Sequence, residues 1–306
     1  MTTAAPARWD TVLGTVDGAV LDCVSGPLAA LLVHAGVQDP HPSLAEDWEA
    51  VPAAPDGGLP RFDLPPADLD ERVAARTGLR PVWHRSGGPA EARDAWRRRD
   101  AVLVLGDAFA LPWLPYFGHA RMSHGFVVTG QDDTAVTIAD PYDNVTEWGK
   151  AAPTVTTIAV PELDAAVTAA DGSVRWAALE PAGAPRPVPA GERIAANARQ
   201  IRAAIDGGVF DRFLTAHREL TAEQVDNLAL QTWLLARSRR LHARWLADDR
   251  FTEDVVTAWD RAQQAAYLAV RRVRRGRPAP DAVLDRIRAA ARAEYATAAR
   301  LLEEDS

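Results

Sequence analysis

The sequence is poor in the residues that build disulfides and zinc sites. It holds one cysteine, Cys23, in 306 residues. A single cysteine cannot form a disulfide within the chain, so nothing here indicates an oxidising compartment. The CxxC and HExxH patterns of zinc sites are also missing. His119, His124 and Asp140 could ligate a metal in principle, but their spacing is a weak signature, and we predict neither a metal nor a bound cofactor.

Long apolar runs and an excess of positive charge are absent too. No stretch approaches the ~18 consecutive apolar residues of a membrane span, and the first residues lack the basic and apolar regions of a signal peptide. The net charge is −8, which disfavours nucleic acid and anionic membrane surfaces as partners. We therefore expect a cytoplasmic protein that binds neither nucleic acid nor a membrane.

The first part of the chain mixes short helices with β-rich runs. Hydrophobic residues make up 47% and charged residues 25%, the balance of a globular protein. Short β-branched runs bounded by turn residues predict strands at 101–107, 124–133, 135–141, 154–160 and 173–179. Helices are expected at 27–36, 66–78 and 88–100. This pattern predicts an α+β domain over residues 1–180, with the strands at 124–133 and 135–141 paired as an antiparallel hairpin.

The second part of the chain differs in texture. A segment rich in proline and glycine, residues 181–192, is typical of a linker or covering loop. Beyond it strand signals vanish, and apolar residues at helical spacing predict helices at 221–246, 252–275 and 280–304. Residues 193–306 are therefore expected to form an all-helical C-terminal domain.

Cys23 lies immediately ahead of an apolar helical run. Pro27 lacks an N–H and fits the first turn of a helix, which places Cys23 at the N-cap or just before it. Free backbone donors and the helix dipole favour a thiolate at that position, and hence a nucleophile. The alternative is a small buried residue that only packs.

His124 and Asp140 are expected to meet at one edge of the sheet. His124 stands at the head of one predicted strand, and Asp140 ends the next strand, 16 positions later. If the two strands form a hairpin, the imidazole and the carboxylate lie side by side. That arrangement lets a carboxylate orient a general base and fix its tautomer.

The spacing of these three residues resembles a known fold. A cysteine at a helix start, a strand-borne histidine about 100 residues on and an Asp-Pro pair after it resemble the papain-like fold of bacteriocin-processing peptidases. More closely, "VLGDAFALPWLPYFGHARMSHGFVVTGQDDTAVTIADP" (104–141) resembles the N-terminal domain of the butirosin biosynthesis protein H family. The shared features are the LPxxPY segment, two nearby histidines, the Gly-x-Asp-Asp hairpin and Asp-Pro. The match covers about Cys23 to Asp140.

The resemblance implies a papain-like cysteine acyltransferase. Cys23 would be the nucleophile, His124 the general base and acid, and Asp140 its orienter. The donor would be an acyl or peptidyl carrier protein, whose phosphopantetheine arm belongs to the substrate, and the acceptor a small-molecule amine in natural-product biosynthesis. Cyclisation, thioester hydrolysis, peptide cleavage and a non-catalytic binding module remain open as alternatives.

Two positions depart from the family pattern. Papain-like enzymes usually carry a glutamine about six residues before the cysteine to help bind the oxyanion, and Asp17 stands there in this chain. An ionised carboxylate cannot donate a hydrogen bond, so we expect either backbone N–H groups to do this or a reactive thioester to need less help. Asp22 replaces a histidine that is common next to the nucleophile.

Further candidates for substrate binding come from both parts of the chain. They are Asp17, Trp113, Tyr116, His119, Trp233 and His242. The aromatic row 111–117 is expected either to pack on the core or to form an apolar wall for an acyl chain. The basic run 271–277 is either a solvated helix end or a docking patch for an acidic partner such as a carrier protein.

Overall fold

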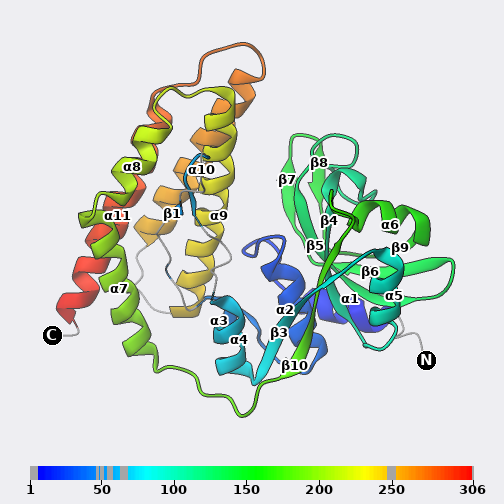
Figure 1. Cartoon of the computed structure of the whole chain (residues 1–306). Coiled ribbons are helices and arrows are strands. Elements are labelled where there is room, and N and C mark those ends of the chain that lie inside the picture. The colour runs from blue at the N-terminus through cyan, green and yellow to red at the C-terminus, as the bar shows by residue number, and fades with distance from the viewer. Residues whose placement is uncertain are drawn as a thin grey trace. The chain divides into compact units, whose positions relative to one another are not determined.

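The computed structural model describes residues 6–45, 48, 52–53, 58–62, 68–246 and 253–304. The chain divides into two compact units: unit 1 comprises 1–44 and 68–187, and unit 2 comprises 45–67 and 188–306. The fold is mixed α/β, with an antiparallel sheet in unit 1 and helices at the C-terminal end, as the sequence predicts (Figure 1).

Unit 1 is built around a six-stranded antiparallel sheet with the strand order β3-β10-β4-β5-β6-β9. Its strands are β3 (Leu79–Ser86), β4 (Val102–Asp107), β5 (Ser123–Gln131), β6 (Ala135–Asp140), β9 (Thr154–Ala159) and β10 (Val174–Pro181). A small hairpin of β7 (Asn144–Thr146) and β8 (Gly149–Ala151) follows β6. The helices are α1 (Pro6–Thr15), α2 (Ser25–His34), α3 (His41–Ala45), α4 (Leu69–Thr77), α5 (Pro89–Trp96), the 3₁₀ turn η1 (Ala108–Ala110) and α6 (Val160–Val167). The last residue of α3, Ala45, belongs to unit 2.

Helices α2 and α6 cover opposite faces of this sheet. Gly125 on β5 pairs with Leu105 on β4, and a side chain at Gly125 would point at α2, since its Cβ would lie 3.5 Å from Pro27. The next residue on β4, Gly106, faces α6 instead, where a Cβ would approach the carbonyl oxygen of Ala166 at 3.1 Å. Because successive strand residues point to opposite faces, the sheet is sandwiched, and the N-terminus of α2 lies beside the start of β5.

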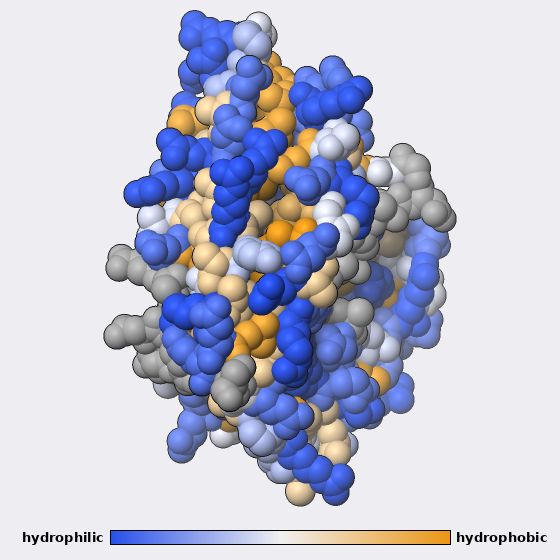
Figure 2. Space-filling view, turned by 90° about the vertical axis from the view of Figure 1, so that its left-hand side faces the viewer, coloured by the Kyte–Doolittle hydropathy of each residue, from blue (hydrophilic) through white to orange (hydrophobic). Residues whose placement is uncertain are grey.

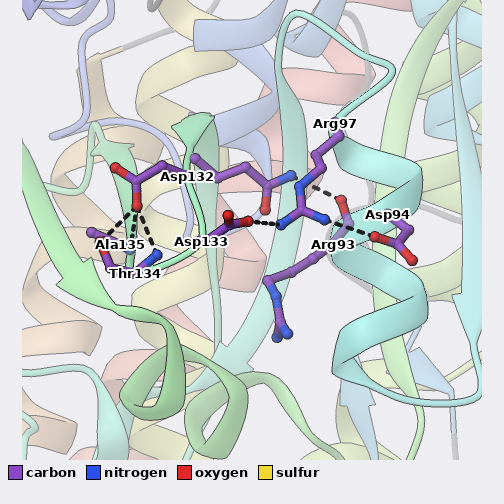
Figure 3. A network of polar contacts seen from close by, with 8 residues as sticks. Arg93, Asp94, Arg97, Asp132, Asp133, Thr134 and Ala135 are labelled. Carbon is purple, nitrogen blue, oxygen red and sulfur yellow. Dashed lines mark hydrogen bonds and ion pairs between the residues drawn. The ribbon is translucent and has the colours of Figure 1, made fainter.

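The β5–β6 hairpin is fixed at its turn. The carboxylate of Asp132 accepts hydrogen bonds from the backbone N–H groups of Thr134 and Ala135, at 2.7 and 2.9 Å. Arg97, which follows the last residue of α5, reaches across to Asp133 at 3.1 Å, as Figure 3 shows. These contacts hold the far end of the hairpin, so its other end, which carries His124 and Asp140, has a defined register.

Helix α2 ends as its sequence predicts. Gly36 adopts a φ of +100°, which favours glycine. The N–H of Gly36 bonds to the carbonyl of Val33, and the N–H of Val37 bonds to that of Leu32. This is the Schellman arrangement, which satisfies the last carbonyls of a helix. The first residue of α2 is Ser25, which places Cys23 one residue before the N-cap.

Unit 2 consists of helices around an apolar core. The helices are α7 (Ala190–Asp206), α8 (Val209–Ala216), α9 (Ala222–Leu246), α10 (Glu253–Val273) and α11 (Ala282–Glu304), with a two-stranded ribbon of β1 (Pro52–Ala53) and β2 (Arg61–Phe62). On the side that bears α7, α8 and α11, polar residues cover most of the surface and apolar ones show between them (Figure 2). This is the pattern of amphipathic helices that pack by their apolar faces.

The unit boundaries differ from the predicted 1–180, 181–192 and 193–306. Residues 45–67, assigned to the first domain by sequence, group with the helices. The reason is local: the ring of Phe62 packs 5.1 Å from that of Phe213, and the N–H of Phe62 donates to Gln231 at 2.6 Å. The predicted linker is also shorter, because β10 includes Pro181 and α7 begins at Ala190. Residues 66, 67 and 252, at the starts of two predicted helices, lie outside the described residues.

Candidate active site

Cys23 is held against the start of β5. The N–H of Gly125 donates to the carbonyl of Cys23 at 3.0 Å, and the thiol donates to the carbonyl of Ser123, with Sγ 3.6 Å from the oxygen. A Cβ at Gly125 would lie 2.5 Å from the Cys23 carbonyl oxygen, so only glycine permits this approach. The cysteine is half-buried, and its sulfur therefore combines a fixed backbone with some solvent access.

The first donors of α2 do not serve the sulfur, contrary to our expectation. The carboxylate of Asp22 accepts from the N–H groups of Val24 and Ser25 at 2.7 and 2.8 Å, and from the Ser25 hydroxyl at 2.8 Å. An aspartate one residue before the thiol thus takes the donors at the helix start. Stabilisation of a thiolate has to come from another group.

That group is His124. His124 and Asp140 are each 1% exposed, and Nε2 of the ring lies 2.8 Å from Oδ2 of Asp140. Continuing the register of β5 and β6, in which Val127 opposes Ala139, sets Asp140 opposite Phe126. The histidine and the carboxylate are therefore diagonal neighbours across the hairpin, within reach of long side chains. The sequence analysis expected His124 directly beside Asp140 across the hairpin. In the structure the residue directly opposite Asp140 is Phe126, two positions after His124.

Asp140 is saturated with donors. Besides His124, its Oδ2 accepts from the indole N–H of Trp113 at 2.8 Å, and its Oδ1 accepts from the N–H of Tyr142 at 3.0 Å. The ring of Tyr142 meets that of His124 edge to face, with centroids 5.0 Å apart. Three donors fix the position of this buried carboxylate, so it holds the imidazole in one orientation.

The pKa of His124 is raised to about 10. Burial disfavours the imidazolium and lowers this pKa, but the charge of Asp140 and the hydrogen bond to its carboxylate outweigh burial, and a hydrogen bond with Cys23 raises the pKa further. Because Nε2 is engaged by Asp140, Nδ1 is the nitrogen available to the thiol. With this raised pKa the ring of His124 is an imidazolium at neutral pH.

One backbone donor lies next to the sulfur. Among the described residues, the N–H of Cys23 makes no hydrogen bond, whereas those of Val24 and Ser25 are taken by Asp22. Asp17 contributes no donor of its own: its carboxylate accepts from the N–H of Ala19 at 3.1 Å. The geometry therefore offers the N–H of Cys23 for an oxyanion that forms on a substrate bonded to Sγ.

The aromatic row 111–117 supports the site more than it lines a groove. Trp113 caps Asp140 and packs edge-on against Phe126, with ring centroids 5.3 Å apart. The buried hydroxyl of Tyr116 lies 3.2 Å from that of Tyr142. His119 is exposed and stacks on Trp148 of the β7–β8 hairpin at 5.6 Å. These contacts tie the 111–119 loop to the segment after Asp140.

Trp233 and His242 belong to unit 2, on α9. The ring of Trp233 lies under the guanidinium of Arg237, 4.4 Å from its centroid. His242 is buried, and its Nδ1 lies 2.8 Å from the carbonyl oxygen of Ala45. Burial, above all, lowers the pKa of His242 to about 4. Ala45 and the neighbouring rings of Trp48 and Trp245 also belong to unit 2, and the lowered pKa keeps the ring of His242 neutral at pH 7.

Sequence reasoning missed Tyr142 and Gly125. Tyr142 follows Asp140 and Pro141 in the same turn, so proximity to a predicted site residue was the available signal. Nothing in the sequence distinguishes Gly125, next to His124, from other glycines in strands. Its role is to let the carbonyl of Cys23, which is far earlier in the chain, approach β5 closely.

Among the described residues, no group of three or more histidine, cysteine or acidic side chains could hold a metal ion. No helix within the described ranges has the length and apolar character that crossing a bilayer requires. No family model and no curated protein matches the chain.

Proposed function

We propose that this chain is a cysteine-dependent acyltransferase with a papain-like catalytic domain in unit 1. The observation that carries the proposal is the buried pair of His124 and Asp140, whose Nε2 and Oδ2 lie 2.8 Å apart, together with the raising of the His124 pKa to about 10 by Asp140 and, further, by Cys23. A half-exposed thiol paired with a buried, carboxylate-anchored imidazole is the arrangement of nucleophilic cysteine catalysis. The resemblance of residues 104–141 to the butirosin family supports acyl transfer in natural-product biosynthesis.

The first half-reaction forms an acyl-enzyme. The Cys23 thiolate attacks the carbonyl carbon of a thioester, and the N–H of Cys23 donates to the oxyanion of the tetrahedral intermediate. Collapse breaks the bond to the donor sulfur, and the His124 imidazolium protonates that leaving thiolate. The products are a free donor thiol, an acyl group on Cys23 and a neutral His124.

The second half-reaction releases the acyl group. An amine attacks the thioester on Cys23, and neutral His124 removes the proton that the nitrogen loses. Collapse of the second tetrahedral intermediate expels the Cys23 thiolate, which regenerates the starting ion pair with His124. Asp140 keeps Nδ1 aimed at the sulfur in both halves and does not itself change protonation.

The donor we propose is a thioester on a carrier protein. In unit 2 the arginines at positions 271, 272, 274, 275 and 277 are all exposed at the end of α10. Five guanidinium groups within seven residues suit a strongly acidic partner surface, and carrier proteins that present a phosphopantetheine arm would fit that description. The acceptor amine would come from a small molecule.

The test is to trap the intermediate. Purified protein is incubated with an acyl-pantetheine thioester, with and without a primary amine, and intact mass is followed. We expect a mass increase that maps to Cys23, is lost in Cys23→Ala, and is discharged to an amide when the amine is added. No acylation at Cys23 would contradict the proposal. Discharge to free acid alone would make the protein a thioesterase, and peptide cleavage without acyl transfer would make it a peptidase.

A further inference from the structure

A second histidine–aspartate pair lies in unit 1, on the segment that follows α2. His41 is 3% exposed. Its Nδ1 lies 2.8 Å from Oδ1 of Asp39, and its Nε2 lies 3.0 Å from the backbone nitrogen of Asp17. A carboxylate only accepts and an amide N–H only donates. The two partners therefore fix the tautomer: Nδ1 carries the proton and donates to Asp39, and Nε2 accepts the N–H of Asp17.

The turn that His41 holds is built on Asp17. The N–H of Val20 donates to the Asp17 carbonyl at 3.2 Å, and the N–H of Ala19 donates to the Asp17 carboxylate at 3.1 Å. His41 accepts the hydrogen bond from the backbone N–H of Asp17. This hydrogen bond is part-buried, and a backbone N–H that loses its acceptor away from bulk water is destabilising, so the conformation of this turn depends on the imidazole.

The same turn packs directly on the segment that carries Asp140. A Cβ placed on Gly18 would collide with the carbonyl oxygen of Pro141 and lie 3.1 Å from the nitrogen of Asp143. From α2, a Cβ on Gly26 would lie 3.3 Å from Cγ of Pro141. Pro141 is buried. Pro141 therefore packs between the turn at Gly18 and the start of α2, and it directly follows Asp140, the residue that orients His124.

We propose that His41 is a positioning residue for the Cys23 site. Through Asp17 and Gly18 it holds Pro141, and through Pro141 it holds Asp140 against His124. The inference rests on the proposed role of Cys23 and adds a requirement to it. His41 touches neither the sulfur nor the catalytic imidazole, so its effect on reactivity passes through the turn.

The experiment compares two substitutions that differ in which ring nitrogen they mimic. The side-chain amide of His41→Gln can place an oxygen near Nε2 and still accept the N–H of Asp17. His41→Asn matches Nδ1 and leaves that N–H without an acceptor. The matched control is His217→Asn in unit 2, because His217 is also fully buried, with Nδ1 on the Phe213 carbonyl and Nε2 on Asn227. The readout is the rate of Cys23 alkylation by iodoacetamide at pH 6, measured at a temperature below the unfolding transition of every variant.

We expect His41→Asn to slow alkylation about tenfold, the scale on which small misplacements act on a reacting group. His41→Gln should stay within about twofold of the natural protein, and His217→Asn should match it even if its melting temperature falls. A wild-type rate in folded His41→Asn overturns the positioning role and leaves the Cys23–His124 pair untouched. If the natural protein itself reacts as slowly as a free thiol, the proposed function fails and this inference fails with it.

A second variant covers the case in which His41→Asn does not fold. Asp39→Ala keeps the imidazole but removes the acceptor that fixes its tautomer. We expect slower alkylation by about threefold, because Nε2 then carries a proton in part of the population and faces the Asp17 N–H donor to donor. An unchanged rate in folded Asp39→Ala contradicts the proposal.

Discussion

Two histidines of this protein are equally buried and behave in opposite ways. His124 in the sheet unit and His242 in the helical unit are each 1% exposed. The pKa of His124 is raised to about 10, and that of His242 is lowered to about 4. Burial alone disfavours the charged ring in both. The difference lies in the partner: a carboxylate faces His124, whereas a carbonyl oxygen faces His242.

The surroundings of the two histidines extend this contrast. The helical unit also buries an ion pair between Arg239 and Glu294. The Oε1 atom of Glu294 also accepts a hydrogen bond from the indole N–H of Trp259 at 2.7 Å. All three of these side chains are fully buried, so the cluster has no path to a substrate. In the sheet unit, a half-exposed thiol stands next to the buried pair. A charged histidine becomes a candidate for chemistry when a reactive group connects it to solvent.

The largest expected effect separates the two histidines by activity. His124→Ala should lower turnover of an acyl-pantetheine thioester by about a thousandfold, since it removes both the general acid and the base. His242→Ala should leave turnover per folded molecule within about twofold of the natural protein. Steady-state rates, corrected for the folded fraction by circular dichroism, provide the measurement. Equal losses of turnover in the two variants would contradict a catalytic role that only His124 has.

A neutral partner tests whether the charge of Asp140 matters. Asp140→Asn keeps the size of the side chain but allows the imidazole to adopt the wrong tautomer, so turnover should fall by on the order of a hundredfold. The pH above which activity declines should also move down from its wild-type position near the His124 pKa of about 10. An unchanged rate and profile would remove Asp140 from its orienting role.

The two histidines should also leave opposite signatures in stability. Because His242 has an ordinary pKa of 6.5 and a folded value of about 4, the unfolded chain binds the extra proton between these values. Stability should therefore fall as pH drops from 6.5 towards 4, by up to about 3 kcal/mol. The raised pKa of His124 acts the other way: its contribution is complete below pH 6.5 and is lost as pH rises towards 10.

Urea unfolding of His242→Gln and His124→Gln across this pH range measures both signatures. Each variant should flatten one arm of the stability profile and leave the other arm as in the natural protein. A single variant that flattens both arms would show that the two sites are not energetically independent.

The smallest expected effect concerns the exposed arginines of α10. Arg272→Glu combined with Arg275→Glu should lower kcat/KM for a carrier-bound thioester by about threefold at low salt, with no change for the free pantetheine thioester. The loss should disappear at high ionic strength, because exposed charges are screened there. Equal effects on both substrates would indicate that these arginines act on folding instead.

Much of the sheet unit could be predicted from sequence, and the reasons are local. The strands near 101–107 and 135–141 are short apolar, β-branched runs bounded by turn residues, and they are β4 and β6. Strand β3 was missed because Pro81 and three basic or imidazole side chains within Leu79–Ser86 interrupt any such run. It forms nonetheless, because β10 pairs with it over its full length. Long-range pairing overrides local propensity there.

The site was predictable in part for the same reason. His124 and Asp140 lie on one hairpin, so sequence spacing alone brings them close. Cys23, in contrast, meets the hairpin only through the fold, and the role of Asp22 in capping α2 follows from side-chain geometry that spacing does not define. The contact of His242 with the carbonyl of Ala45 could not be predicted, because helical periodicity marks a buried position without identifying its neighbour.

The most direct test of the central claim is the pH dependence of Cys23 alkylation in the natural protein and in His124→Ala. Iodoacetamide reacts with thiolates, and mass spectrometry reports the extent of labelling at this single cysteine. A thiolate held by an imidazolium predicts rapid labelling at pH 6, at least about tenfold faster than a model thiol, and loss of that advantage in His124→Ala. Labelling that is slow at pH 6, rises with pH as for a free thiol and is the same in both proteins would contradict the account.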